Sequence, residues 1–239
     1  MIGRRTCPRP VKSQHCELPD EGLIDLNAQN QRLAPKAYQR ILDLILSGET
    51  RPGTYLNERQ LADMLEMSRT PVRDALLMLE AEGLIVRHGR LGVQIKEMRI
   101  EEFLDALQIR ALLEPAVARM AAGKVDGTEL DKLEKALHSA LKKANGVDRS
   151  LTRWIDDHLH GLISECAGNP QLTSIVRNLR RKTQIFDLKN VPERAAATCH
   201  EHLEIVAALR SGDSDESAKA MTRHLEQVQA SIIARLNRI

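Results

Sequence analysis

Three histidines and an aspartate in the C-terminal half of the chain have the chemistry of a metal site. Asp156 and His160 are four residues apart and therefore share one face of a helix. His202 and His224 each fall in step with the apolar residues of their own helical segments, so these imidazoles are expected to point inward. One carboxylate and three imidazoles bind a divalent metal such as zinc and leave positions open for water or a ligand.

The same four residues also fit simpler interpretations. An inward histidine is more often a hydrogen-bonded core residue than a metal ligand, and an Asp–His pair at this spacing is often only a surface contact. Asp157, three residues before His160, is a rival carboxylate. Spacing alone leaves these alternatives open.

A second group of residues, between Asn57 and Gly92, suits contact with DNA. Arg69 and Arg73 lie four residues apart near the expected start of a helix. A helix N-terminus attracts phosphate through its free amides and its dipole, and arginine can donate to both guanine acceptors in the major groove. A solvated helical hairpin is the plainer alternative, but the ordered set of basic residues favours DNA binding.

Two short helices and two strands are expected to position these arginines. The first helix opens at Asn57, and the second has Pro71 in its first turn, where a missing N–H does no harm. The strands are expected at 83–86 and 93–95, with a basic tip between them suited to a phosphate backbone or a minor groove. An earlier helix is expected to open at Pro35 and to end at Ser47-Gly48.

From Ile100 onward every segment has helical periodicity. Six helices are expected, the first bent at Pro115, joined by short connections into an antiparallel bundle. The expected limits are 100–123, 126–146, 150–168, a helix that follows Pro170, a loop near 188–193, a helix that ends at 211–212 and one from 213 to the end. The expected domains are a flexible extension at 1–30, a DNA-binding domain at 31–97 and a helical domain at 98–239.

Composition limits the alternatives. The 239 residues carry a formal net charge of only +2, so any basic character must be local. Aromatic residues make up 2% of the chain, which argues against RNA-binding modules that stack bases on aromatic side chains. No apolar run approaches the roughly 18 residues of a membrane span, and the N-terminus does not look like a secretory signal. Four scattered cysteines are expected to be free thiols in a cytoplasmic protein.

The stretch from Pro52 to Gly92 resembles the winged helix-turn-helix of the GntR family of bacterial transcription regulators. The matching motifs are Pro52-Gly53, Leu56-Asn57-Glu58-Arg59, Leu61-Ala62, Ser68-Arg69-Thr70-Pro71-Val72-Arg73-Asp74-Ala75-Leu76, Leu79-Glu80, Glu82-Gly83-Leu84 and Arg90-Leu91-Gly92. Glu66, Met67 and Asp74 depart from the usual pattern. The DNA-binding residues expected from the resemblance and the basic tip are Arg59, Ser68, Arg69, Thr70, Arg73, Arg90 and Gly92.

The helical half resembles the FadR-type ligand-binding domain (FCD) that follows this DNA-binding domain in one branch of the family. The matching stretches are Arg110 to Pro115, Asp156 with Leu159-His160, Gly168-Asn169-Pro170, Glu201-His202, Gly212-Asp213, Met221 and His224-Leu225. The resemblance implies that Asp156, His160, His202 and His224 ligate a divalent metal, which holds the carboxylate of a small effector. Arg110 would then meet that carboxylate; a salt bridge to Glu114 is the alternative.

The expected protein is mostly α-helical: a winged helix-turn-helix followed by an all-α bundle. The expected function is that of a cytoplasmic homodimer that represses transcription. It would bind a short palindromic operator in double-stranded DNA and respond to a small organic acid, with no membrane partner. Two alternatives remain: a metal-dependent enzyme that uses the Asp/His cluster, and a regulator whose helical domain only dimerises.

Overall fold

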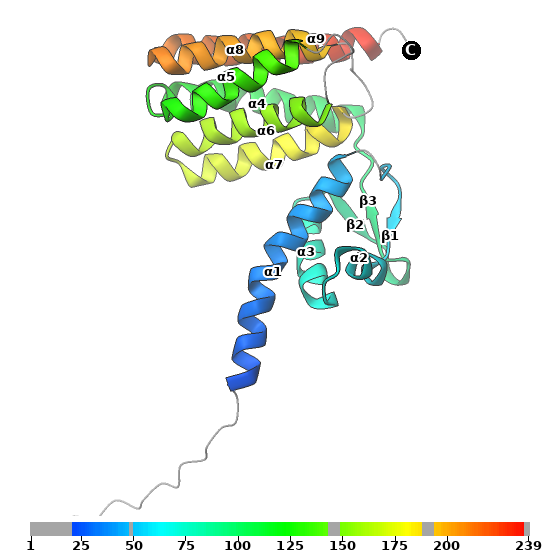
Figure 1. Cartoon of the computed structure of the whole chain (residues 1–239). Helices are drawn as coiled ribbons and strands as arrows, with labels where there is room; N and C mark the ends of the chain where they lie inside the picture. The colour runs from blue at the N-terminus through cyan, green and yellow to red at the C-terminus, as the bar shows by residue number, and fades with distance from the viewer. Residues whose placement is uncertain (1–20, 48–49, 143–148, 188–193, 237–239) are drawn as a thin grey trace, which may run out of the picture.

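A computed structural model describes residues 21–47, 50–142, 149–187 and 194–236 as a small winged domain beside a helical bundle (Figure 1). The winged domain contains α1 (Glu21–Leu46), β1 (Tyr55–Leu56), α2 (Glu58–Leu65), α3 (Arg69–Ala81), β2 (Ile85–Arg87), the 3-10 turn η1 (Gly89–Leu91) and β3 (Val93–Ile95). The bundle contains α4 (Ile100–Ala121), α5 (Gly127–Lys142), α6 (Arg149–Cys166), α7 (Pro170–Asp187), α8 (Ala195–Ser211) and α9 (Ser214–Leu236).

The helix pair α2–α3 forms as expected. Asn57 caps α2, because its side-chain oxygen accepts a hydrogen bond from the backbone N–H of Arg59 at 2.8 Å. Pro71 lies in the first turn of α3. Both helices bury a row of apolar residues, and α1 packs along α3 to complete that core. These residues are Leu61, Ala62, Leu65, Val72, Ala75, Leu76 and Leu79.

The wing is a three-stranded antiparallel sheet with the order β1-β3-β2. Strand β1 was not expected; it pairs Tyr55 with Gln94. Strand β2 begins two residues later than expected, because Gly83 has a φ of +72° and belongs to the turn after α3. Gly92 has a φ of +99°, and a Cβ there would lie 2.5 Å from the carbonyl oxygen of Leu56. The wing therefore requires glycine at this position for its own backbone geometry.

Helix α1 begins at Glu21, so the prediction that Pro35 opens the first helix is wrong. A proline inside a helix removes one backbone donor, which a long helix with a buried apolar face can tolerate. Residues 21–30, expected to belong to the extension, are the first turns of α1. Residues 1–20 lie outside the described part of the chain.

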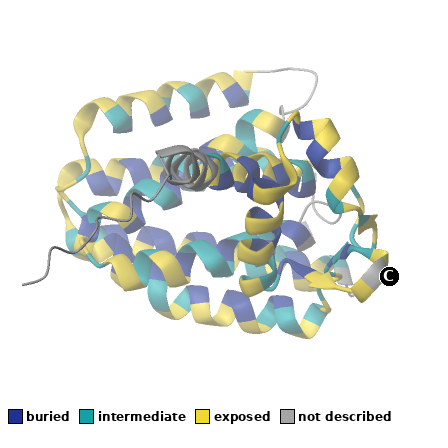
Figure 2. Ribbon diagram, turned by 90° about the horizontal axis from the view of Figure 1, so that it is seen from below, coloured by how far each residue is buried: buried dark blue, intermediate teal, exposed yellow. Residues whose placement is uncertain are grey.

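Within its described residues the bundle has the six predicted helices. Asp126 and Asp213 act as caps, since their Oδ1 atoms accept backbone N–H groups of Thr128 and Asp215. The predicted end at 145–146 and the loop at 188–193 lie outside the described residues. Helix α4 packs against α6, α7 and α9, and buried residues line the helix sides that face one another (Figure 2). Among the described helices, none is long and apolar enough to cross a membrane.

Candidate metal centre and nucleic-acid interface

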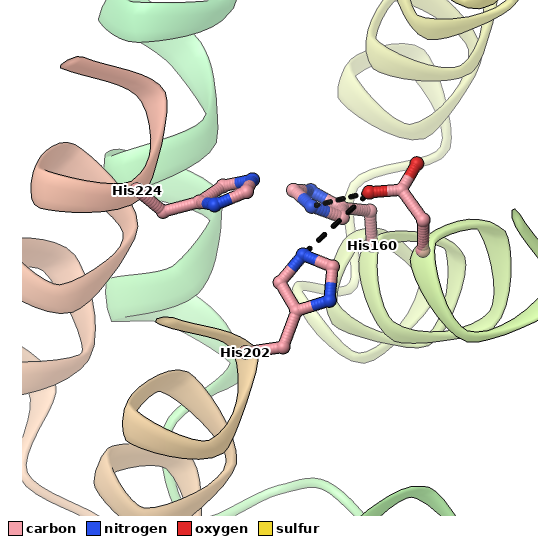
Figure 3. Close-up of side chains that lie close together, drawn as sticks. His160, His202 and His224 are labelled. Atoms are coloured by element: carbon pink, nitrogen blue, oxygen red, sulfur yellow. Dashed lines mark ion pairs between the residues drawn. The ribbon is translucent and has the colours of Figure 1, made fainter. Parts of the chain in front are cut away.

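The four predicted metal ligands lie together in the bundle. Asp156 and His160 come from α6, His202 from α8 and His224 from α9. One candidate ligand atom from each residue lies within 4.8 Å of the others, and the rings converge on a common point between the helices (Figure 3). The three histidines are almost fully buried.

The distances identify which carboxylate belongs to the group. Asp156 Oδ1 lies 3.7 Å from His160 Nε2 and 3.6 Å from His202 Nε2. Asp157 accepts a hydrogen bond from the side-chain amide of Gln184 and lies 3.5 Å from Arg180 Nη2, whereas the group of converging ligand atoms contains Asp156. Of the two carboxylates that spacing left open, Asp156 is the one that faces the histidines.

The histidines carry unused ring nitrogens. His160 Nε2 and His202 Nε2 are buried, and neither has a hydrogen-bond partner among the residues that the structure describes. A buried polar atom normally finds a partner, because leaving it unpaired costs free energy. Both Nε2 atoms point toward the same oxygen, Asp156 Oδ1. A metal ion between them would accept the nitrogen lone pairs, which receive no hydrogen bond from the described protein groups. The residues present therefore fit a divalent metal.

Two carboxylates outside the cluster orient its rings. Glu114 Oε2 lies 2.5 Å from His160 Nδ1, and Glu201 Oε2 lies 2.8 Å from His224 Nδ1. A ring whose Nδ1–H donates to a carboxylate presents Nε2 to a metal, and this pattern is usual behind histidine ligands. This role was not predicted for Glu114 or Glu201. The four-residue spacing of Glu114 from Arg110 pointed only to a salt bridge.

Two buried arginines balance the buried carboxylates. Arg110 Nε donates to Glu114 Oε1 at 2.6 Å and its Nη1 donates to Thr183 Oγ1 at 2.9 Å, so the salt bridge considered for Arg110 is present. Arg180 Nη2 donates to Asp156 Oδ2 at 2.5 Å and to the Asp156 carbonyl oxygen at 3.0 Å. Arg180 was not predicted, because it stands in a run of basic residues typical of a solvated surface.

The pKa shifts of His160, His202 and Asp156 favour the protonation states in which these groups bind a metal. Burial, and then the charge of Arg180, lower the pKa of His160 to about 4. Burial and the neighbouring His224 hold the pKa of His202 well below its usual value. Burial alone would raise the pKa of Asp156, but Arg180 and the imidazoles hold it well below the usual range. Near pH 7 these two imidazoles are therefore neutral and the carboxylate is ionised, as metal ligands must be.

The predicted DNA-binding residues lie in two places: on α2 and at the start of α3, and in the wing, which contains Arg90 and Gly92. Ser68 is the N-cap residue of α3 and is exposed, and its hydroxyl makes no capping hydrogen bond to the described backbone. Arg69 pairs with Glu58 at 3.0 Å while remaining largely exposed. Arg59, Thr70 and Arg73 are also exposed. Arg90 lies in η1, and its side chain is outside the described part of the structure.

Comparison with known proteins follows the same division of the chain. The family described as "Bacterial regulatory proteins, gntR family" matches residues 33–95, and the FCD domain family matches residues 105–227. The HTH-type transcriptional repressor RspR of Escherichia coli K12 is 29% identical over 186 residues, which cover 76% of this chain and 80% of RspR.

Two solved structures support the fold. E. coli McbR/YncC superposes with a TM-score of 0.72 at 20% identity, covering 85% of this chain and 98% of that protein. The metal-free FCD domain of a candidate transcriptional regulator gives a TM-score of 0.52 at 22% identity, covering 60% of this chain and 99% of that domain. At these identities the likeness concerns the fold alone.

Proposed function

The chain belongs to the GntR family of bacterial regulatory proteins, in the branch with an FCD domain, and we propose that it is a metal-dependent, metabolite-responsive repressor. It is a transcription regulator with a DNA-binding domain, and its family and relatives are not enzymes. The repressor assignment is supported by RspR, whose name describes a repressor. We expect it to act in the cytoplasm, where its operator would lie.

The DNA-binding proposal rests on the exposed start of α3. Arg73 projects from the first turns of that helix, beside the exposed Ser68, Arg69 and Thr70. We propose that α3 enters the major groove, with the helix N-terminus on phosphate and Arg73 on a base edge. Two chains in a homodimer would present two such helices to the halves of a short palindrome.

Arg73→Ala tests the interface. Selection from random duplex DNA with the wild-type protein supplies the operator, and fluorescence anisotropy gives its affinity. The variant should lose about 1–3 kcal/mol of operator binding and relax the preference at one base position. Arg119→Ala is the control, because this exposed arginine pairs with Asp215 in the bundle. Equal operator affinity in Arg73→Ala and wild type would overturn the assignment of Arg73.

The observation that carries the metal proposal is a pair of buried Nε2 atoms that face Asp156 and have no hydrogen-bond partner within the described ranges of the chain. We propose that Asp156, His160, His202 and His224 hold a divalent ion, with zinc as the expected metal. When bound, the ion supplies a positive charge that can anchor an anionic ligand.

The balance of buried charges favours a carboxylate as that ligand. Within the group, Arg110 and Arg180 offset Glu114 and Asp156. A divalent ion bound by this group adds positive charge to a poorly solvated site, and an anionic effector would offset it. We propose Arg110, oriented by Glu114, as a further contact for the effector.

Two measurements test the metal and the effector. Elemental analysis of purified protein should find about one divalent ion per chain. A thermal-shift screen of small mono- and dicarboxylates, run with and without a chelator, should find an acid whose stabilisation needs the metal. Absence of metal would leave the helical domain as a dimerisation module. A stabilising acid unaffected by the chelator would place its site away from the ion.

A further inference from the structure

Helix α7 contacts both halves of the protein with residues adjacent in sequence. Arg180, Thr183 and Gln184 lie on one face of the helix and contact the shell of the metal centre. Arg181 and Ile185 lie on a second face, about a third of a turn around the axis, and contact the winged domain. Helices α1 and α7 lie against each other at this contact (Figure 1).

The first face of α7 binds Asp156, the carboxylate that we propose as a metal ligand. Arg180 Nη2 is bonded to both the side chain and the carbonyl oxygen of Asp156. Gln184 donates to Asp157 and lies 3.5 Å from Asp156 Oδ2. The Thr183 hydroxyl accepts a hydrogen bond from Arg110. Any rearrangement of Asp156 on metal binding therefore acts directly on α7.

The second face of α7 contacts the C-terminal end of α3, the helix that we propose enters the major groove. Glu82 is the C-cap of α3, and both its carboxylate oxygens lie 2.8 Å from Arg181 Nη1. The Tyr38 hydroxyl donates to Glu82 Oε2 at 2.7 Å, and the Arg181 guanidinium lies 5.3 Å from the centre of the Tyr38 ring. Ile185 is buried in the apolar core of the winged domain.

The Arg181–Glu82 contact between α7 and α3 is well ordered, and a cleft lies beside it. The Arg181–Glu82 pair is about one quarter exposed, and Tyr38 orders it from a second helix. Such a pair is better fixed than a solvated surface ion pair. A cleft of about 570 Å³ opens next to it, lined by Glu82, Arg177 and Arg181 among others. A small shift of α7 can therefore change how α3 is held.

We infer that α7 couples the metal centre to the DNA-binding domain, with Arg180 positioning Asp156 and Arg181 holding the end of α3. The inference rests on the proposed metal site and adds the element that transmits its occupancy. A rigid helix that both sites bias is the physical requirement for such coupling. Because coupling between two binding equilibria is reciprocal, DNA bound at α3 should in turn change the metal affinity.

Hydrogen–deuterium exchange of the full chain, with and without Zn²⁺ alone, tests the inference. The reporters are the amides of Glu82, Gly83 and Leu84, which are hydrogen-bonded to Met78, Glu80 and Leu79. Zn²⁺ should slow exchange in α6, α8 and α9, and should slow these reporters at least about fivefold, the lower end of typical allosteric coupling.

Arg181→Ala should keep the slowing in α6, α8 and α9 and lose it at the reporters. Arg177→Ala is the matched control, because this arginine lies one turn earlier on α7 and pairs with Glu165 of the bundle. It should behave as wild type. If Arg181→Ala does not fold, Glu82→Gln makes the same test, because it removes the charge and keeps the shape.

The outcomes separate the two proposals. Slowing in α6, α8 and α9 with unchanged reporters in wild type would overturn the coupling and leave the metal site standing. Retention of the slowing at the reporters in Arg181→Ala or Glu82→Gln would overturn the coupling in the same way. No Zn²⁺ effect in any helix would overturn the metal site, and the coupling with it.

Discussion

At the scale of single residues, His202 has the clearest metal-ligand environment. It is 1% exposed and faces Asp156 and two other rings, but in the described part of the chain its Nε2 atom has no hydrogen-bond partner. We expect His202→Ala to weaken zinc binding by more than about 100-fold, beyond the 10–100-fold typical of changes behind the ligands. Competition with a fluorescent chelator measures this affinity.

A nearby position on the same helix gives a matched control. His200 lies two residues away on α8, is exposed, and has the same side-chain chemistry. His200→Ala should bind zinc like wild type. Equal affinities for His202→Ala and wild type would exclude His202 from the site.

Glu201 and Glu114 orient rings from outside the cluster, but they differ in burial. Glu201 is partly exposed, whereas the Glu114 and Arg110 side chains are only 3% and 6% exposed. Glu201→Gln should lower zinc affinity about 10–100-fold with little loss of stability. Glu114→Gln should also destabilise the fold, by roughly 3–5 kcal/mol, because it leaves the Arg110 charge buried and uncompensated.

Chemical denaturation together with zinc titration of both variants checks this contrast. If Glu114→Gln unfolds at the same denaturant concentration as wild type, the buried pair does not stabilise the bundle. If Glu201→Gln binds zinc as tightly as wild type, Glu201 does not orient His224.

Part of the candidate metal site could be predicted from the sequence. The predicted residues give a local signal along the chain, and the others do not. His202 and His224 could be predicted because each falls in step with the apolar residues of its helix, and Asp156 and His160 because they share one helix face. The resemblance to the FCD domain joined the four into one candidate metal site. Arg180 gave no such signal: its partner Asp156 is 24 residues away, on another helix. Glu201 was noticed only as part of a motif, since its bond to His224 joins α8 and α9. Contacts between helices have no periodicity along the chain.

At the scale of elements, the turn between α2 and α3 has a strained residue. Glu66 is the C-cap of α2 with a φ of +53°, the one non-glycine residue with positive φ in the described part of the chain. This left-handed conformation costs roughly 1–2 kcal/mol for residues with a Cβ. We expect Glu66→Gly to stabilise the winged domain by about 1 kcal/mol, after the larger unfolded-state entropy of glycine is included.

Urea denaturation measures the gain, and Glu66→Ala separates its causes. Alanine removes the carboxylate but keeps the Cβ, so its stability should stay close to that of wild type. If Glu66→Ala gained as much as Glu66→Gly, loss of the charge and not release of backbone strain would be the cause.

The helices of the bundle were predictable because their signals are local. Capping residues such as Asp126 and Asp213 mark where helices begin, and apolar periodicity marks how far each one runs. Together these signals give the helix limits within a few residues. Strand β1 has only two residues, and it exists because Tyr55 and Leu56 pair with β3 almost forty residues later. The early start of α1 was missed because proline is common in the first turn of helices. Pro35 lies inside α1 instead.

At the scale of the whole molecule, the two domains have separate apolar cores. The bundle core is built from α4 to α9, and the winged core receives Ile185 of α7 as its contribution from the bundle. A metal bound only to the native bundle should therefore stabilise the bundle most. At a free zinc concentration 100 times its dissociation constant, this gain is about 2.7 kcal/mol.

Calorimetry with and without a chelator measures that gain. For a domain of this size, about 2.7 kcal/mol corresponds to a rise in Tm of roughly 5–15 °C. Asp156→Asn should abolish the shift, because it removes the anionic ligand that faces His160 and His202. Asp157→Asn is the neighbouring control, since Asp157 contacts Gln184 instead, and it should keep the shift. A shift that survives in Asp156→Asn would mean that zinc stabilises the protein from another site.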